Sequence, residues 1–152
     1  MTAEIHILVI FSCENGEVER LALAAAVGAV QARAFIRLRR FVGATASPNA
    51  ITERMDQDYV APRPADTAWA DGLVLAIADH YLPQLQALGG LAGKPAVSLA
   101  QGNTSGGLKE AELLSDRVLS KDEGVEVDER DRARLVGRQL AETARARKGS
   151  SH

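Results

Sequence analysis

The sequence predicts one α/β domain built on a central parallel sheet of four or five strands. Three observations support this fold class. Short, continuous apolar runs occur at 5–11, 73–78 and 96–100, as expected of strands that are buried on both faces. Segments with helical spacing of apolar residues follow these runs. The chain has 152 residues, of which 46% are hydrophobic and 25% charged, and this composition is typical of a single globular domain.

Composition also excludes several classes of protein. A net charge of −2 argues against a nucleic-acid-binding surface. The single cysteine, Cys13, rules out a disulfide framework and a structural zinc site, and the three histidines have no metal-ligand spacing. No apolar run approaches the ~20 residues of a membrane span. Because residues 1–4 lack the basic start of a signal peptide, we expect a cytoplasmic protein.

The first half of the chain predicts two strands with a helix between them. The run at 5–11 forms the first strand, and residues 17–32 form a helix whose apolar stripe comprises Val18, Leu21, Ala22, Ala25 and Ala29. Residues 33–41 mix apolar and basic side chains, which predicts a second strand near an edge of the sheet. Residues 42–65 contain three prolines and form a long connection, with one short helix expected over 49–57.

The second half predicts two further strands and three helices. Strands are expected at 73–78 and 96–100, with a helix of at most two turns at 82–88 between them. A helix over 108–120 and a candidate fifth strand over 124–127 follow. Asp128 is the expected N-cap of the last helix, whose stripe comprises Ala133, Val136, Leu140 and Ala144. We assign residues 1–148 to the domain and treat 149–152 as a disordered tail, either native or left from cloning.

Three loops leave the carboxyl ends of the predicted strands, at 12–17, 79–82 and 101–107. In parallel sheets ligands bind at this edge, so we expect the site there. The first loop leads into a helix N-terminus, which favours an anion. Its candidate ligands are Ser12, Asn15 and Gly16, whereas its carboxylates would repel a phosphate: Glu14, Glu17 and Glu19. The alternative is that these acidic residues serve only to stabilise the helix.

Two further groups of residues are candidates for catalysis. Cys13 follows the first strand as in low-molecular-weight phosphatases, but position 19 is Glu where that chemistry needs Arg, so a buried thiol is the favoured interpretation. His80 with Asp79 offers general acid–base chemistry, although adjacent residues rarely face each other, and a polar turn is the alternative. Tyr81 could stack on a planar ring. His6 lies within a strand and is expected to be structural.

The loop at 101–107 contains three glycines, which allow the backbone to approach a flat ligand. It matches neither a dinucleotide-binding fingerprint nor a Walker loop. Its three glycines are Gly102, Gly106 and Gly107, and the side chains between them could hydrogen-bond such a ligand: Asn103, Thr104 and Ser105.

These features, in this order, resemble the flavodoxin-like superfamily, and within it the tryptophan-repressor-binding-protein type of NAD(P)H:quinone oxidoreductase and the multimeric flavodoxins. The resemblance rests on residues 9–16, on Ala-Asp-Gly-Leu-Val-Leu at 70–75, on Leu-Ala-Gly-Lys-Pro-Ala at 91–96 and on the paired glycines of the 101–107 loop. It implies a three-layer sandwich that binds FMN through all three loops. The implied FMN-binding residues are Ser12, Cys13, Asn15, Gly16, Glu17, Asp79, His80, Tyr81, Gln101, Gly102, Asn103 and Gly107.

The sequence departs from the family in each of these loops. Cys13 replaces the usual Ser or Thr, Glu17 replaces a neutral or polar residue, and Asp79-His80-Tyr81 replaces a longer Ser-Pro-Thr-Tyr segment. Two functions therefore stay open. The first is an FMN-binding redox protein that takes electrons from NAD(P)H and passes them to a quinone-like acceptor. The second is a scaffold that has lost FMN and acts as a non-catalytic binding module. The resemblance also implies self-association.

Overall fold

The computed structural model describes residues 4–12, 16–41, 54, 58–77, 81–91, 93–99, 112–113 and 129–150. Its centre is an all-parallel sheet of five strands with the order β2-β1-β3-β4-β5. The strands are β1 (His6–Phe11), β2 (Phe35–Arg40), β3 (Gly72–Ala76), β4 (Pro95–Ser98) and β5 (Glu112–Leu113). The predicted α/β class and the parallel sheet are therefore confirmed, and β2 lies at the edge as expected.

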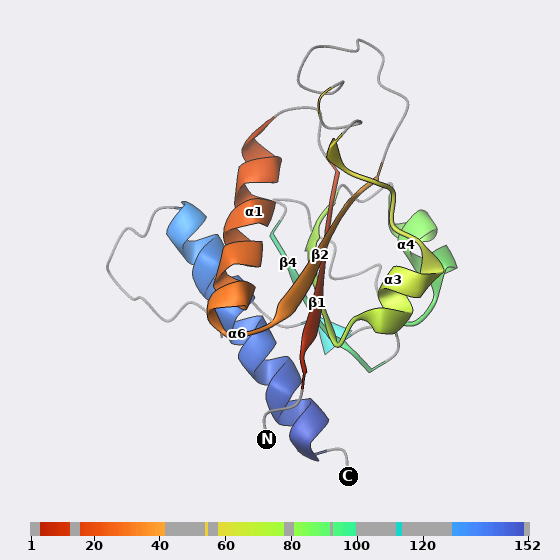
Figure 1. Cartoon of the computed structure of the whole chain (residues 1–152). Helices are drawn as coiled ribbons and strands as arrows, with labels where there is room; N and C mark the ends of the chain where they lie inside the picture. The colour runs from red at the N-terminus through yellow and green to blue at the C-terminus, as the bar shows by residue number, and fades with distance from the viewer. Residues whose placement is uncertain are drawn as a thin grey trace.

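Helices cover the two faces of the sheet and produce three layers (Figure 1). Helices α1 (Gly16–Gln31) and α6 (Glu129–Ser150) pack on one face. Helices α3 (Pro64–Trp69) and α4 (Leu82–Leu88) pack on the other. None of the helices in the described ranges is long and apolar enough to span a membrane.

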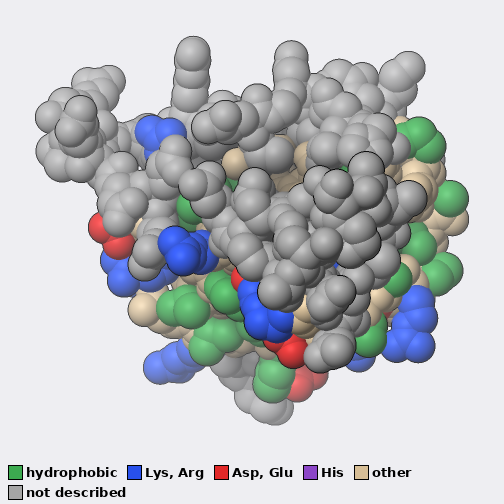
Figure 2. All heavy atoms as spheres, turned by 90° about the horizontal axis from the view of Figure 1, so that it is seen from above, with side chains coloured by type: hydrophobic (Ala, Val, Ile, Leu, Met, Phe, Trp, Pro, Cys, Tyr) green, Lys and Arg blue, Asp and Glu red, His purple; other side chains and the backbone are tan. Residues whose placement is uncertain are grey.

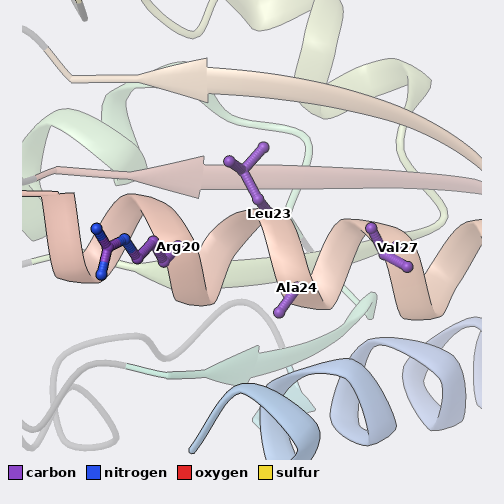
Figure 3. Close-up of a pocket in the computed structure, with 4 residues that line it drawn as sticks. All are labelled: Arg20, Leu23, Ala24 and Val27. Carbon is purple, nitrogen blue, oxygen red and sulfur yellow. The ribbon is translucent and has the colours of Figure 1, made fainter.

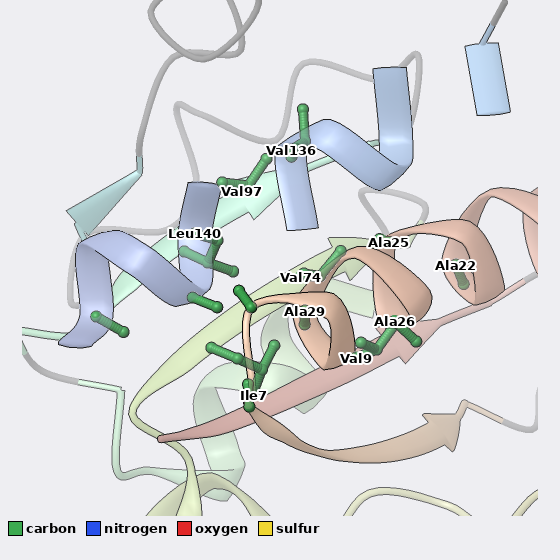
Figure 4. Packing of buried hydrophobic residues seen from close by; sticks show 14 of the residues in the cluster. Ile7, Val9, Ala22, Ala25, Ala26, Ala29, Val74, Val97, Val136 and Leu140 are labelled. Carbon is green, nitrogen blue, oxygen red and sulfur yellow. The ribbon is translucent and has the colours of Figure 1, made fainter. Parts of the chain in front are cut away.

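Alternation along β1 divides the core between the two faces, because successive side chains of a strand point in opposite directions. Ile7 and Val9 contact the α1–α6 layer, while Leu8 and Ile10 contact the α3–α4 layer, and all four are fully buried. Figure 4 shows the first of these clusters, in which small alanines of α1 lie against valines of the sheet. This two-sided burial explains why the strand sequences are continuously apolar.

The two long helices cross at glycines. A Cβ atom on Gly28 of α1 would lie 1.8 Å from the carbonyl oxygen of Arg134, and one on Gly137 of α6 would lie 2.0 Å from the carbonyl oxygen of Ala25. Both contacts are with backbone, which cannot rotate out of the way. Glycine at these two positions therefore sets how closely α1 and α6 approach.

Most predicted elements occur where expected, with three differences. The structure adds α3 within and just after the predicted connection, where Pro64 supplies the fixed φ of a first helical turn. The helix predicted over 108–120 is wrong at 112–113, which pair with β4 as strand β5. The last helix extends to Ser150, beyond the predicted domain boundary. The candidate strand at 124–127 and most of the short helix at 49–57 lie outside the described residues.

Candidate functional site at the carboxyl edge of the sheet

All five strands end at the same edge of the sheet, and the chain leaves the two central strands in opposite directions there. After β1 it enters α1 on one face, and after β3 it enters α4 on the other (Figure 1). β1 and β3 are hydrogen-bonded neighbours, and parallel sheets bind ligands at the edge where two neighbouring strands lead to opposite faces in this way. The topology therefore places the candidate site at the ends of β1 and β3.

Four of the twelve predicted site residues lie within the described ranges. Ser12 directly follows β1, is buried, and donates its backbone N–H to the carbonyl oxygen of Ala76 at 3.0 Å, which joins the ends of β1 and β3. Gly16 and Glu17 are the first two residues of α1, so the dipole of that helix points at this edge. The other eight lie outside the part of the chain that is described: Cys13, Asn15, Asp79, His80, Gln101, Gly102, Asn103 and Gly107.

Tyr81, the fourth of these residues, lies immediately before α4 and is half-buried. Its ring stacks on that of Phe41, with centroids 5.1 Å apart and an angle of 11° between the planes. Phe41 is buried, and its backbone N–H donates to the carbonyl oxygen of Phe11 at 3.0 Å. The end of β2 therefore supports the ring of Tyr81 from one side, and this support holds a partly exposed aromatic ring at the carboxyl edge.

Glu19, in the first turns of α1, is buried in an ion-pair cluster. Arg54 binds its carboxylate with both terminal nitrogens, at 3.1 Å to Oε2 and 2.5 Å to Oε1. The hydroxyl of Tyr59 donates to Oε2 at 2.7 Å. Arg54 also donates to Asp58 at 3.1 Å. This two-pronged geometry is the strong form of an arginine–carboxylate contact.

The charge of Glu19 is compensated within this cluster. Hydrogen bonds from Arg54 hold the pKa of the Glu19 carboxyl below its ordinary value, although burial alone would raise it. Tyr59 and the nearby charge of Arg40 act in the same direction as Arg54. Burial, followed by the hydrogen bond to Glu19, raises the pKa of Tyr59 to about 12. The negative charge of Glu19 is therefore compensated by Arg54, which reduces the repulsion that this carboxylate was expected to exert on a phosphate at the start of α1.

The same segment is fixed to the edge strand. The backbone N–H of Arg40 donates to the carbonyl oxygen of Val60 at 3.0 Å, which extends the sheet by one bridge. The ring of Tyr59 meets that of Phe11 edge to face at 4.8 Å. Residues 58–60 therefore line the carboxyl edge beside α1. Sequence patterns did not indicate Arg54 or Tyr59, because their partner Glu19 lies 35 residues from Arg54 and 40 residues from Tyr59 in the chain.

Ser98 ends β4 at this edge, opposite Leu75 of β3. Its hydroxyl oxygen is buried and has no hydrogen-bond partner among the described residues. A buried hydroxyl without a partner costs about 1–3 kcal/mol, so it marks a position where a ligand atom or a water would be favourable.

A second polar cluster lies away from this edge and is structural. The buried carboxylate of Asp66 accepts hydrogen bonds from Arg37 at 3.1 Å and from Arg39 at 3.0 and 3.2 Å. Trp69 stacks on His6 at 4.5 Å and lies under the Arg37 guanidinium at 4.3 Å. His6 is thus packed between sheet and helix, in keeping with the structural role expected for it. Within the described ranges no three His, Cys, Asp or Glu side chains group as metal ligands.

Comparisons with known proteins show similarity of fold at low sequence identity. A diflavin flavoprotein A3 from Nostoc sp. superposes with a TM-score of 0.54 at 14% identity, and the match covers 99% of both chains. A flavone reductase superposes with a TM-score of 0.50 at 17% identity, covering 97% of this chain and 66% of that one. No family model matches the sequence, and no curated protein matches it.

Proposed function

Because the chain has the flavodoxin-like fold, we propose that it binds FMN at the carboxyl edge of its sheet and transfers electrons through it. The observation that carries the proposal is the order 2-1-3-4-5 of an all-parallel sheet, for which the flavin site lies where the connections after β1 and β3 diverge. Ser12 and Tyr81 lie in those two connections. Both residue types suit a flavin, one as a hydroxyl donor and the other as an aromatic surface.

Each loop has a distinct role in this proposal. Ser12, Asn15 and Gly16 hold the phosphate, where backbone N–H groups and the dipole of α1 favour an anion. Tyr81 stacks on the flavin ring. Residues 101–107 supply backbone and amide contacts to it. Bound FMN would supply the redox chemistry, and the protein supplies orientation and electrostatics.

Two features of the described residues support the fit. Three carboxylates near the start of α1 would disfavour a phosphate there, and Arg54 compensates the charge of one of them, Glu19. The buried hydroxyl of Ser98, which has no partner in the described part of the chain, provides a polar contact at the same edge. These observations favour the flavin-binding function over a scaffold that has lost its cofactor.

We further propose that the flavin-binding protein is an NAD(P)H:quinone oxidoreductase. NAD(P)H would reduce the flavin and a quinone-like acceptor would take the electrons, in a cytoplasmic protein that self-associates. This part of the proposal follows from the family resemblance of the sequence.

Titration of FMN into the purified protein tests the proposal directly. We expect quenching of flavin fluorescence and a shifted flavin absorbance on binding. Absence of binding at high micromolar FMN would refute the proposal and favour the scaffold without cofactor. A bound flavin that NADH and NADPH both fail to reduce would refute only the oxidoreductase assignment.

Substitution of Tyr81 tests where the flavin lies. Loss of one ring–ring contact costs roughly 1 kcal/mol, so Tyr81→Ala should weaken FMN binding about five-fold. Tyr81→Phe keeps the ring and is the matched control, with an affinity close to that of the wild type. Equal affinity of Tyr81→Ala and wild type would place the flavin away from this residue.

A further inference from the structure

The outward face of α1 is apolar. Leu23, Val27 and Val30 are 38%, 50% and 52% exposed and follow each other at helical spacing along one side of the helix. Leu23, Ala24 and Val27, together with Arg20, line a shallow hollow on this surface (Figure 3). We refer to Leu23, Ala24, Val27 and Val30 as the α1 stripe.

The α1 stripe is unusual for a helix on a protein surface. Such helices bury one apolar side and expose a polar one. Here the side facing the sheet and α6 is apolar too, with Ala22, Ala25 and Ala29 fully buried. No Asp or Glu occurs between positions 20 and 31. An exposed apolar patch on the outward side of such a helix is typical of an interaction site.

An arginine lies at each end of the stripe. Exposed Arg20 lies at its start and exposed Arg33 just beyond its end. Arg134 and Arg138 of α6 lie where that helix crosses α1, since their backbone atoms are the nearest to a Cβ on Gly28. Both are exposed, and each pairs with an exposed acidic residue of α6, at 3.4 Å to Asp131 and 3.5 Å to Glu142 respectively, so these pairs add little net charge. Figure 2 shows both basic and acidic side chains beside hydrophobic ones on the surface seen from above.

We infer that the α1 stripe docks an amphipathic helix of another protein, with its apolar side on the stripe and acidic residues facing Arg20 and Arg33. Charge selects this occupant. A second copy of the chain placed on the same face would bring Arg20 and Arg33 towards the same arginines of its partner, which is repulsive. An acidic helix meets complementary charge at both ends of the stripe. This charge pattern speeds its association with α1 and fixes the position at which it binds along the stripe.

Designed peptides provide the test. One peptide, roughly four helical turns long, carries a leucine stripe flanked by Glu, and a second carries the same stripe flanked by Lys. We expect the Glu-flanked peptide to bind the full-length protein in a fluorescence anisotropy titration, and the Lys-flanked peptide to bind at least about ten-fold more weakly. Binding of the Glu-flanked peptide should weaken at high salt.

Variants locate the peptide on the protein. Val27→Asp places a charge in the centre of the stripe and should weaken binding at least about ten-fold. Val60→Asp is the matched control, because Val60 is a valine of similar exposure, 54%, outside the stripe. Arg20→Ala should weaken binding and reduce its salt dependence. Circular dichroism of each variant confirms that the helices are intact, and Val27→Asp should bind FMN as the wild type does.

Four results would overturn the inference. The first is no binding of the Glu-flanked peptide, and the second is equal binding of the two peptides. The third is wild-type protein that sediments as a dimer while Val27→Asp sediments as a monomer, which would identify the occupant as a second copy. The fourth is a wild-type protein that binds anionic phosphatidylglycerol vesicles through the stripe but neither peptide, which would identify a lipid surface.

Discussion

The crossing of α1 and α6 gives the most quantitative prediction. In Gly28→Ala the new Cβ would lie 1.8 Å from the carbonyl oxygen of Arg134 and 2.7 Å from its carbonyl carbon. Ordinary carbon–oxygen contact needs roughly 3.2–3.4 Å, so the helices must separate locally by about 1.5 Å. A gap of 0.5–1 Å already removes about a quarter to a half of the dispersion attraction of the atoms that line it.

The expected net cost follows from two opposing effects. Overpacking typically costs about 1–3 kcal/mol and sometimes more, and the clash here is with backbone, so we take roughly 3–4 kcal/mol. Alanine in the middle of a helix regains about 1 kcal/mol relative to glycine. Gly28→Ala should therefore lower the free energy of unfolding by about 2–3 kcal/mol. Urea unfolding followed by helical circular dichroism measures this difference.

Gly137 of α6 provides an independent test of the same helix crossing. Gly137→Ala places its Cβ 2.0 Å from the carbonyl oxygen of Ala25, across the same crossing. One separation of the helices accommodates both new methyl groups, so the double variant should cost less than the sum of the single variants. Ala24→Gly on the outward side of α1 is the control and should cost only about 1 kcal/mol. A Gly28→Ala protein as stable as the wild type would show that the helices do not cross in this way.

Three further predictions concern charged and polar groups. Burial alone would raise the pKa of the Asp66 carboxyl, but hydrogen bonds from Arg39 and from the backbone of Arg63 hold this pKa below the ordinary value. The ionised carboxylate therefore contributes fully to the stability of the fold above about pH 4, and this contribution is lost as the pH falls through the lowered pKa. Asp66→Asn should therefore flatten the acid side of the stability profile from urea unfolding, and an unchanged profile would contradict the assignment. Tyr59 has a pKa of about 12, so its hydroxyl keeps its proton and its hydrogen bond to Glu19 at neutral pH. The contribution of this hydrogen bond to stability is present below about pH 10 and is lost as the pH rises through 12. Tyrosinate absorbance should show a titration near pH 12 in the wild type, and this titration should be missing in Tyr59→Phe. If FMN binds at the start of α1, Glu17→Thr removes a carboxylate near the phosphate and should tighten binding by up to roughly a hundredfold, and unchanged affinity would mean that Glu17 faces solvent.

The strands and long helices could be predicted because local patterns specify them. Burial on both faces makes the strands continuously apolar, and the stripe of the last helix coincides with its buried residues Ala133, Val136, Leu140 and Ala144. Helix α3 could not be predicted in this way, since it has six residues and buries Asp66 and Thr67 instead of an apolar stripe. The pattern Arg-Pro-Ala-Asp at 63–66 is the signal that could have indicated it, with proline at a first helical turn and an acidic residue two positions later.

The sequence predicts at which edge of the sheet the candidate site lies, but it predicts only some of the residues that surround it. The strand pattern alone predicts that Ser12 and Tyr81 lie at one edge, because the carboxyl ends of parallel strands meet there. The support of Tyr81 by Phe41 and the pairing of Glu19 with Arg54 join segments 40 and 35 residues apart. No local periodicity encodes such a pair, because both partners are brought together only when the sheet and its connections have formed.

The attachment of the last helix to the first strand has a consequence for synthesis on the ribosome. Lys148 donates to the carbonyl oxygen of Glu4 at 2.8 Å and contacts Asp71 at 3.2 Å, across 144 and 77 residues of chain. Arg145 likewise donates to the carbonyl oxygen of Ala32 at 2.6 Å. Among the described residues, α1 and α6 cover this apolar face of β1, β3 and β4, so half of its cover is missing until α6 emerges. At about 5–20 residues per second, the nascent chain exposes that face for several seconds, during which a chaperone that binds apolar segments would find it accessible.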